Sequence, residues 1–426
     1  MKIKLNSSLP GPKSKKILLD MEKINGGKGI PFPFVHSRKG EGAYFEDLDG
    51  NVFLDFACQI ASNPLGYNHP DMIKVIRKYQ NFPVKYAGQD FFLEEHRDLI
   101  KKLTSISPKG LNSAFLVNSG AEAVENSMKI SMRKKPKMKF SVSFDGAFHG
   151  RTLGALSLHH SKEVHRKGYV LEPNKKLPWD DSAGEKLNKL IKQHGVESVG
   201  FVILEHFQGE GGYRIPSKKM IREVRKICLQ NEIPYISDEV QAGMGRTGKF
   251  WSFEHYGIKP DIFSSAKALQ IGAVVANKKM FPEVPGSISS TWGGGHRLDL
   301  ALGIKTIELI EKQKLLQKNR VNGAYFMKGL NKLGVENVRG RGLMIAFDLE
   351  NQRKRDDFII ESLKNGLVLL GAGEKSIRVI PPYIITRNDM DLGLEVIEKT
   401  LGKIGEKGFK HSGKICEFVG CGIEVS

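Results

Sequence analysis

An aspartate and a lysine occupy similar positions in the second half of the chain, each close behind a short apolar run. Asp238 follows the run at 235–236, and Lys267 follows the run at 262–263. Apolar runs that end in polar residues are typical of buried parallel strands, whose carboxyl ends meet at one edge of a sheet. Ligands bind at that edge in open α/β sheets. The sequence therefore predicts a carboxylate and an amine that face one bound molecule.

One chemistry that uses such a pair is catalysis with pyridoxal phosphate (PLP). A lysine holds the aldehyde of this cofactor as a Schiff base, and an acid keeps the pyridine nitrogen protonated so that the ring accepts electrons. Lys267 is the candidate Schiff-base lysine, and Asp238 is the candidate partner of the ring nitrogen. From these two residues alone, the alternative is a pair of ordinary strand-end charges that neutralise each other.

A longer stretch around Asp238 favours the catalytic interpretation. Residues 237–251 read Ser-Asp-Glu-Val-Gln-Ala-Gly-Met-Gly-Arg-Thr-Gly-Lys-Phe-Trp, which resembles the signature of the class III aminotransferases, the ornithine, acetylornithine, 4-aminobutyrate and lysine ε group. Further blocks follow in this family's order from about Gly40 to about Leu401. The resemblance implies an α/β protein of PLP fold type I, like aspartate aminotransferase. Its large domain would have a mostly parallel central sheet, with a smaller α+β domain beside it.

The pattern of predicted strands and helices agrees with a parallel sheet joined by right-handed crossovers. The apolar run Val199–Leu204 predicts a central buried strand, and a helix from about Lys218 to Leu229 returns the chain to the strand of Asp238. We expect residues 66–310 to form the large PLP-binding domain. Residues 311–426 are expected to form the C-terminal small domain.

The N-terminal part is expected to join the small domain as an arm and a hairpin, residues 1–65. Alternating residues on both sides of Asp49-Gly50-Asn51 predict the hairpin. The first forty residues are basic and rich in Pro and Gly, so we predict an arm with little regular structure.

Residues 115–122 predict a strand followed by the start of a helix, in which Ser119 and Glu122 fit a capping box. The N-terminus of a helix favours a bound anion, although capping alone would explain Ser119 without a ligand. By the family resemblance, Ser119, Gly120 and Ala121 bind the phosphate of PLP.

The resemblance assigns three more positions to the cofactor. Phe148 stacks on the pyridine ring, Gln241 hydrogen-bonds the 3-oxygen of the ring, and Thr291 binds the PLP phosphate of a neighbouring subunit. We count His149, beside Phe148, with the cofactor-binding residues, although a histidine there is more often a satisfied structural residue. A Thr291 that reaches the other subunit implies a homodimer with active sites at its interface.

The resemblance also suggests how two unlike substrates share the site. Arg378 matches the arginine that binds the α-carboxylate of 2-oxoglutarate through its planar fork, although it would equally fit a surface strand. Glu210 neutralises Arg378 while the amino donor is bound and then swings away. Arg151 matches an arginine that binds a substrate carboxylate.

Gln59 and Ile60 are candidates for the substrate wall, because the family's matching segment enters the active site. A simple loop packed on the core is the alternative for each of them. Together with Ser289, they depart from the pattern of the lysine enzymes, and one residue is missing between Gln270 and Gly272.

Several blocks nevertheless resemble L-lysine 6-aminotransferase (lysine ε-aminotransferase) most, among them Gly-Ala-Phe-His-Gly-Arg at 146–151 and Ser-Thr-Trp-Gly-Gly at 290–294. The resemblance implies a PLP-dependent transaminase that moves the terminal (ω) amino group of an amino acid such as L-lysine to 2-oxoglutarate, giving a semialdehyde and glutamate. A 4-aminobutyrate or ornithine-type aminotransferase and an amino-acid racemase of the same fold remain alternatives.

Charge and composition limit the other classes of function. The chain has 66 Lys and Arg against 47 Asp and Glu, a formal net charge of +19. Its lysines are spread through helical stretches without aromatic interleaving, so we interpret them as a solvated surface and expect no nucleic-acid partner. A basic scaffold protein without catalysis is the alternative, and it would require Lys267 or Asp238 to be replaced.

No signal-peptide pattern and no run of about 18 apolar residues occur. We therefore expect a cytoplasmic protein with no membrane partner. The four cysteines are too few and too scattered for a disulfide framework, and we predict no metal site from them.

Overall fold

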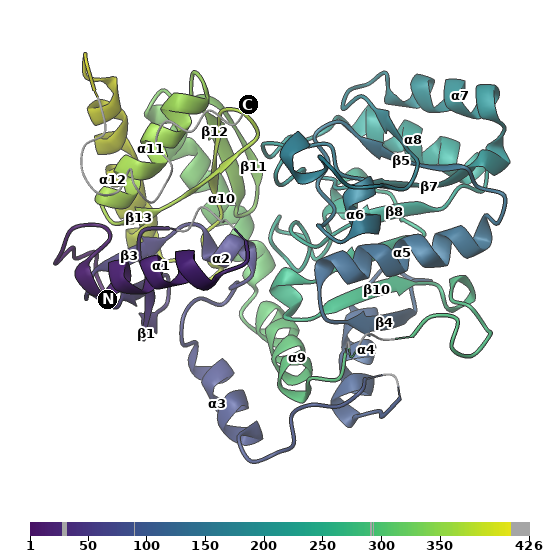
Figure 1. Cartoon of the computed structure of the whole chain (residues 1–426), viewed down its shortest axis with the longest axis horizontal. Coiled ribbons are helices and arrows are strands. Elements are labelled where there is room, and N and C mark those ends of the chain that lie inside the picture. The colour runs from purple at the N-terminus through teal and green to yellow at the C-terminus, as the bar shows by residue number, and fades with distance from the viewer. Residues whose placement is uncertain (28–31, 89, 290–291, 293, 410–426) are drawn as a thin grey trace. The chain divides into compact units, whose positions relative to one another are not determined.

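The computed structural model of the chain describes residues 1–27, 32–88, 90–289, 292 and 294–409 (Figure 1). The chain divides into two compact units. The first comprises Met1–His69, Ala324–Val338 and Ile345–Ser426, and the second comprises Pro70–Gly323 and Arg339–Met344.

The second unit is built on a seven-stranded sheet with the strand order β4-β10-β9-β8-β7-β5-β6. Its strands are β4 (Ser113–Val117), β5 (Phe140–Phe144), β6 (Asn174–Leu177), β7 (Val199–Leu204), β8 (Tyr235–Asp238), β9 (Ile262–Ser265) and β10 (Gly272–Ala276). β10 is antiparallel to β4 and β9, and every other neighbouring pair is parallel. The mostly parallel sheet of an α/β fold is thereby confirmed.

The central strands of this sheet are buried on both faces, which explains their unbroken apolar sequence. Every residue of β7 is buried, and helix α5 (Gly120–Lys134) packs across β7, β9 and β10 (Figure 1). The other helices of the unit are α3 (Pro70–Tyr79), α4 (Glu94–Ser105), α6 (Leu153–Ser157), α7 (Ala183–His194), α8 (Lys218–Gln230) and α9 (Arg297–Lys312). The helix predicted near 218–229 is confirmed as α8.

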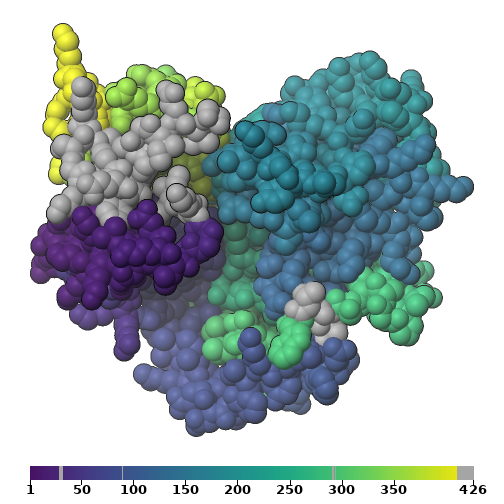
Figure 2. Space-filling model, in the orientation of Figure 1, coloured from purple at the N-terminus to yellow at the C-terminus, as the bar shows by residue number. Residues whose placement is uncertain are grey.

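Two segments far apart in the sequence meet in the second unit. Lys85 forms an isolated bridge with His296, and Tyr86 N–H donates to the Gly295 carbonyl at 2.9 Å. Figure 2 shows the blue surface of the first segment beside the green surface of the second. This contact fixes the chain that enters α9.

The first unit contains two small sheets, apart from residues Arg339–Met344, which belong to the second unit. One has the order β1-β2-β3-β13 and the other β11-β12-β15-β14. Their strands are β1 (His36–Glu41), β2 (Tyr44–Asp47), β3 (Val52–Asp55), β11 (Glu336–Arg341), β12 (Met344–Asp348), β13 (Leu367–Val368), β14 (Leu370–Ala372) and β15 (Ser376–Val379). β2 and β3 pair antiparallel around the Asp49-Gly50-Asn51 turn, so the predicted hairpin is confirmed.

The helices of the first unit include α11 (Gln352–Lys364) and α12 (Arg387–Gly405), while α10 (Leu315–Lys332) continues from one unit into the other. Between Glu336 and Asp348 the chain forms two strands, β11 and β12. Gly342 has a φ of +55°, and this left-handed residue turns the chain between the two strands.

The expectation of an N-terminal arm with little regular structure is wrong, because residues Pro12–Ile24 form helix α1. Pro12 stands at the start of the helix, where its missing N–H costs nothing. The Asp49 carboxylate accepts the N–H groups of Lys13 at 2.8 Å and Ser14 at 2.9 Å. A side chain of the hairpin therefore caps the helix, which local sequence patterns do not reveal.

Candidate active site

Four neighbouring strands, β5, β7, β8 and β9, end at the same edge of the central sheet. Asp238 is the last residue of β8 and pairs in register with Ser264 of β9. Lys267 begins the short 3-10 helix Lys267–Leu269 directly after β9, and Glu205 follows β7. The carboxylate and the amine predicted from the sequence are thus offered at one edge.

Asp238 is held by its neighbours in a fixed orientation. Its side chain is 5% exposed, Oδ2 lies 2.8 Å from His149 Nδ1, and Oδ1 accepts the Val240 N–H at 3.0 Å. His149 Nε2 is buried and has no hydrogen-bond partner among the described residues. His149 therefore contacts Asp238 directly and connects the end of β5 to the end of β8.

The N-terminus of α5 lies against the residues that follow β8 and β9, the strands that precede Val240 and Ala266. A Cβ atom on Gly120 would be 2.8 Å from Val240 Cγ1 and 3.5 Å from Ala266 Cβ. Only a glycine permits this approach, because a side chain would push α5 away from the residues that adjoin Asp238 and Lys267. The first N–H groups of α5, which have no intrahelical partners, are thereby brought to the same edge.

Ser119 caps this helix, as the sequence predicts. Its Oγ accepts the Glu122 N–H at 3.2 Å, and Glu122 Oε2 accepts the Ser119 N–H at 2.9 Å. The hydroxyl uses only an oxygen lone pair in this bond and can still donate its hydrogen to an anion. Together with the N–H groups of Gly120 and Ala121, it could hold a phosphate.

Two loops close around this position. A Cβ on Gly150 would lie 2.9 Å from Ala121 Cβ, so the loop after β5 packs directly on the start of α5. A Cβ on Gly209 would lie 2.9 Å from Gln241 Oε1, which accepts a hydrogen bond from the Tyr213 hydroxyl at 3.0 Å. The amide carbonyl of Gln241 is thus engaged, and its NH₂ group is left to donate to a ligand.

Phe148 is half-buried between histidine and arginine side chains. The His159 ring meets it edge-on at 4.8 Å, and the Arg151 guanidinium lies 5.6 Å from its centre. Burial lowers the pKa of His159 to about 3, so this imidazole is neutral at neutral pH. Phe148 is therefore supported on one side by a neutral ring.

The turn after Lys267 is shaped to pack on the cap of α5. Gln270 has a φ of +70° and its Nε2 donates to the Lys267 carbonyl at 3.1 Å. A Cβ on Gly272 would lie only 2.4 Å from the Ser119 carbonyl oxygen. The backbone that carries Lys267 is thus fixed against the backbone that carries Ser119.

Two buried glutamates near Asp238, Glu205 and Glu239, were not assigned a role from the sequence. Glu205 accepts two backbone N–H groups, from Phe148 at 3.0 Å and Gly209 at 2.8 Å. Burial raises its pKa to about 7, an effect that the charge of His149 opposes and that of Asp238 reinforces. The signal available in the sequence was an acid placed directly after an apolar strand.

Glu239 is the second buried glutamate. It accepts hydrogen bonds from Ser237 Oγ at 2.8 Å, Ser252 Oγ at 2.6 Å and Ser252 N–H at 2.7 Å. Burial raises its pKa to about 7. These bonds anchor the loop that carries Gln241 to the strand that carries Asp238.

The predicted substrate residues fall into different parts of the chain. Glu210 and Arg151 belong to the second unit, where Glu210 lies 3.9 Å from Lys162 Nζ and Arg151 is exposed. Arg378 belongs to the first unit, is 5% exposed in β15, and is therefore not a surface residue of its strand. Thr291 lies outside the described residues.

Gln59 and Ile60 lie in the first unit, in a turn with unusual backbone geometry. The turn α2 (Cys58–Ala61) has φ values of +50°, +50°, +59° and +66°, which cost roughly 1–2 kcal/mol for each non-glycine residue. Such strain is concentrated at functional positions. The packed loop considered from the sequence does not describe Ile60, whose side chain is 49% exposed.

Side chains around this turn compensate for its strain. Gln59 Nε2 donates to the Tyr67 hydroxyl at 2.8 Å, and that hydroxyl donates to Asp55 Oδ2 at 2.8 Å. Asp55 Oδ1 accepts the N–H groups of Ala57 and Cys58, both at 2.8 Å. The Gln59 side chain is therefore engaged within its own unit, whereas Ile60 points its apolar side chain to the surface.

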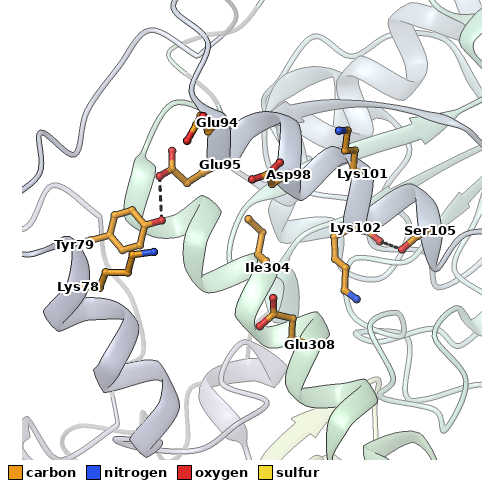
Figure 3. Close-up of a pocket in the computed structure, with 10 residues that line it drawn as sticks. All are labelled: Lys78, Tyr79, Glu94, Glu95, Asp98, Lys101, Lys102, Ser105, Ile304 and Glu308. Carbon is orange, nitrogen blue, oxygen red and sulfur yellow. Dashed lines mark hydrogen bonds between the residues drawn. The ribbon is translucent and has the colours of Figure 1, made fainter.

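A hollow elsewhere in the second unit does not share residues with this site. Helices α3, α4 and α9 line it with charges of both signs, and the Tyr79 hydroxyl donates to Glu95 Oε1 at 3.0 Å (Figure 3). Its lining residues are Lys78, Tyr79, Glu94, Glu95, Asp98, Lys101, Lys102, Ser105, Ile304 and Glu308. The hollow offers no nucleophile or buried base comparable to the sheet edge.

Two further findings concern ions and membranes. In the described part of the chain, no group of three or more His, Cys, Asp or Glu side chains could hold a metal ion. None of the helices formed by those residues is both long enough and apolar enough to span a bilayer.

The sequence matches known proteins over most of its length. The family model described as Aminotransferase class-III matches residues 27–401. An acetylornithine aminotransferase of Caldanaerobacter subterraneus is 34% identical over 382 residues, which cover 86% of this chain and 94% of that protein. A probable mitochondrial 4-aminobutyrate aminotransferase of Caenorhabditis elegans is 31% identical over 93% of both chains.

Solved structures share the fold. A lysine aminotransferase of M. tuberculosis superposes with a TM-score of 0.84 at 24% identity, covering 92% of this chain and 99% of that one. At this level of identity the likeness concerns the fold, which is of PLP fold type I.

Proposed function

Because the chain belongs to the class-III aminotransferase family, we propose that it transfers the terminal amino group of an amino acid such as L-lysine to 2-oxoglutarate. The products are a semialdehyde and glutamate. The observation that carries the proposal is the pair of strand ends that offers Asp238 and Lys267 at one edge of the sheet. L-Lysine as the donor is supported by the motif resemblance at residues 146–151.

Enzymes of this family depend on PLP, and the chain is a PLP-dependent aminotransferase. This cofactor binds the amino group of the substrate and accepts the electrons released when a C–H bond breaks. The N–H groups at the start of α5, with Ser119, Gly120 and Ala121, suit its phosphate. The Gln241 amide suits its 3-oxygen, and Phe148 suits the face of its ring.

The residues around the ring nitrogen and the aldehyde have separate tasks. The negative charge of Asp238 holds a proton on the ring nitrogen, and His149 prevents the Asp238 carboxylate from rotating. Lys267 would hold the cofactor through its Nζ, and this amine would become free when the amine of the donor binds. Its Nζ then acts as the general base that takes the proton from the substrate carbon bearing the amine.

Recognition of two substrates rests on charges. We assign Arg378 to the α-carboxylate of 2-oxoglutarate, Glu210 to neutralising Arg378 while the donor is bound, and Arg151 to a carboxylate of the donor. Gln59 and Ile60 are assigned to the substrate wall. Of these two, Ile60 fits the methylene chain of an ω-amino acid, because Gln59 is engaged with Tyr67.

Class-III aminotransferases are generally dimeric. We propose a homodimer in which Thr291 of each protomer binds the PLP phosphate of the other. The large domain is then residues 66–310, and the small domain is formed by residues 1–65 and 311–426. We also propose that the protein acts in the cytoplasm.

The names of curated relatives favour a second candidate donor. One acetylornithine aminotransferase is 34% identical to the chain and one probable 4-aminobutyrate aminotransferase is 31% identical, and their named substrates also carry a terminal amine. A donor of the ornithine or 4-aminobutyrate type is therefore the alternative to L-lysine.

The test is a half-reaction with the purified protein loaded with PLP. L-Lysine, L-ornithine, N-acetylornithine and 4-aminobutyrate are added separately, and the visible absorption of the bound cofactor is followed. Loss of the band with one ω-amine, and its return on addition of 2-oxoglutarate, would establish the reaction and identify the donor. A Lys267→Ala variant serves as the control and should not respond. If no ω-amine acts while an α-amino acid loses optical activity, a racemase replaces this proposal.

A further inference from the structure

Glu205 joins two loops that flank the candidate active site. It follows β7, between the ends of β5 and β8 in the sheet, and is 6% exposed. Its Oε1 accepts the Phe148 N–H at 3.0 Å, and its Oε2 accepts the Gly209 N–H at 2.8 Å. One side chain therefore binds two backbone positions, 148 and 209, that are 61 residues apart in sequence.

Each of these loops carries residues assigned to the reaction. The loop after β5 presents Phe148 and His149, and the loop after β7 presents Glu210. Around Glu205 the loops touch directly, because Gln208 Nε2 donates to the Asp145 carbonyl at 2.7 Å. Glu205 is thus the link that lies closest to the aromatic ring, at the Phe148 backbone itself.

A buried carboxylate at this position lowers the stability of the folded protein unless both of its oxygens accept hydrogen bonds. Burial disfavours the charged form and raises the pKa of Glu205 to about 7. Replacement by glutamine would remove the charge but leave one carbonyl oxygen and one NH₂ group. That NH₂ group would face one of the two backbone N–H donors, so only one of the two loops could remain bonded.

We propose that Glu205 is a positioning residue for the cofactor, which sets the spacing between the loop of Phe148 and His149 and the loop of Glu210. The inference rests on the proposed function, because it requires Phe148 to lie against the PLP ring. It predicts that losing one of the two bonds displaces the Phe148 ring relative to the cofactor without unfolding the protein.

Glu125 provides a matched control. It is also a glutamate that accepts two backbone N–H groups, from Gly154 at 3.0 Å and Ala155 at 3.3 Å, but both bonds go to the same oxygen, Oε1. Glutamine at position 125 can keep that oxygen in place. The same chemical change should therefore be tolerated at Glu125 and harmful at Glu205.

The experiment compares wild type, Glu205→Gln and Glu125→Gln. PLP affinity is measured by titrating each apoprotein, visible circular dichroism reports the asymmetry around the bound cofactor, and urea unfolding reports the stability of each apoprotein. For Glu205→Gln we expect roughly tenfold weaker PLP binding, the effect of one unsatisfied buried donor, and a weaker dichroic band. The unfolding midpoint at neutral pH should change little, because removing the buried charge offsets the lost bond. Glu125→Gln should match wild type in all three measurements.

Unchanged PLP affinity and dichroism in Glu205→Gln would overturn the proposal. So would a loss of apoprotein stability as large as the loss of PLP affinity, since that indicates a purely structural role. If the Glu205→Gln apoprotein does not fold, Glu205→Asp replaces it. The shorter side chain withdraws both oxygens, so the same loss of PLP affinity is expected, and unchanged affinity overturns the inference. Failure of the wild-type protein to bind PLP would instead refute the proposed function itself.

Discussion

Asp55 in the first unit and Glu205 in the second solve a similar problem in different ways. Each is a buried carboxylate at the end of a strand, 2% and 6% exposed respectively, and burial raises the pKa of both. Asp55 receives two backbone N–H groups on one oxygen and a tyrosine hydroxyl on the other. Glu205 receives one N–H group on each oxygen, from separate loops.

The difference lies in what each carboxylate stabilises. Asp55 supports a local turn whose backbone is strained, and its nearest polar side chain is the neutral Tyr67. Glu205 supports two loops whose backbones come from distant parts of the chain, and its nearest ionisable groups are His149 and Asp238. The first region therefore combines its buried carboxylate with a strained backbone, and the second combines its buried carboxylate with further charged groups. Substitutions that remove charge should affect them differently from substitutions that remove hydrogen-bond acceptors.

The largest effect is expected where buried charge and chemistry coincide. Asp238→Asn keeps the shape of the side chain but removes the charge that maintains a proton on the ring nitrogen. We expect kcat to fall by about 10²–10⁴-fold, the range for groups that hold or move a proton during the reaction. Steady-state assays with the donor identified above would measure it. If the variant retained more than about a fifth of wild-type kcat while binding PLP normally, the charge of Asp238 would not have the role assigned to it in the second region.

The next largest effect concerns acceptors in the strained region. Asp55→Ala leaves two N–H groups and a hydroxyl without their acceptor, so the free energy of unfolding should fall by about 4 kcal/mol. Asp55→Asn keeps an oxygen for both N–H groups and should cost about 1 kcal/mol. Urea unfolding of the three proteins at pH 7 measures the difference. If asparagine were as damaging as alanine, charge would matter in the first region too.

A pH series separates the two carboxylates further. A buried Glu205 with a folded-state pKa of about 7 and an unfolded-state value of 4.5 binds its proton more tightly when folded. Its contribution to stability is therefore complete below pH 4.5 and is lost as the pH rises to about 7, by up to about 3 kcal/mol. His149 and Asp238 are the charges that modify this value.

Accordingly, Glu205→Gln should be less stable than wild type at pH 5 and equally or more stable at pH 8. Unfolding of the apoproteins by urea at both pH values measures the crossing. A difference between variant and wild type that does not depend on pH would show that Glu205 does not titrate in this range. Glu125→Gln, whose wild-type carboxylate is less buried, serves as the reference.

The smallest effect tests the strain itself. Ile60 has a φ of +59° and is half-exposed, so Ile60→Gly relieves the left-handed backbone with little loss of burial. We expect the free energy of unfolding to rise by about 0.5–1 kcal/mol. Ile17→Gly, at an exposed position in the interior of helix α1, should instead lower it by about 1 kcal/mol. Thermal unfolding measures both effects. A raised midpoint for the variant at position 60 and a lowered midpoint for the helix variant would support backbone strain at Ile60, and lowered midpoints for both would contradict it.

The sequence predicts best those parts of the site that depend on local pattern. Asp238 and Lys267 each follow an apolar run, and a buried strand has to deliver the next residues to its carboxyl edge. The cap at Ser119 and the hairpin turn at Asp49-Gly50-Asn51 are likewise determined by neighbouring residues. These elements therefore appear in the structure near the positions expected for them.

The sequence predicts poorly what depends on distant partners. Helix α1 is capped by Asp49, 36 residues beyond Lys13, and Glu205 is bonded to Phe148, 57 residues before it. Four consecutive left-handed residues at Cys58–Ala61 contradict every local preference. Side chains from outside the turn stabilise them, because Asp55 accepts the Cys58 N–H and the Tyr67 hydroxyl accepts a hydrogen bond from Gln59. Such contacts between residues distant in sequence cannot be predicted from the pattern of neighbouring residues.

The parallel pairing of β3 with β13 has a consequence for how the protein is made. Leu54 of β3 pairs with Leu367 of β13. The sheet β1-β2-β3-β13 of the first unit therefore acquires its fourth strand only after more than 300 further residues have been synthesised. On the ribosome the edge of β3 therefore waits unpaired while the long middle segment, Pro70–Gly323, is produced and can fold. An unpaired strand edge readily joins another chain. During synthesis there is thus an interval in which the exposed edge of β3 has to be protected from pairing with other chains until β13 has been made.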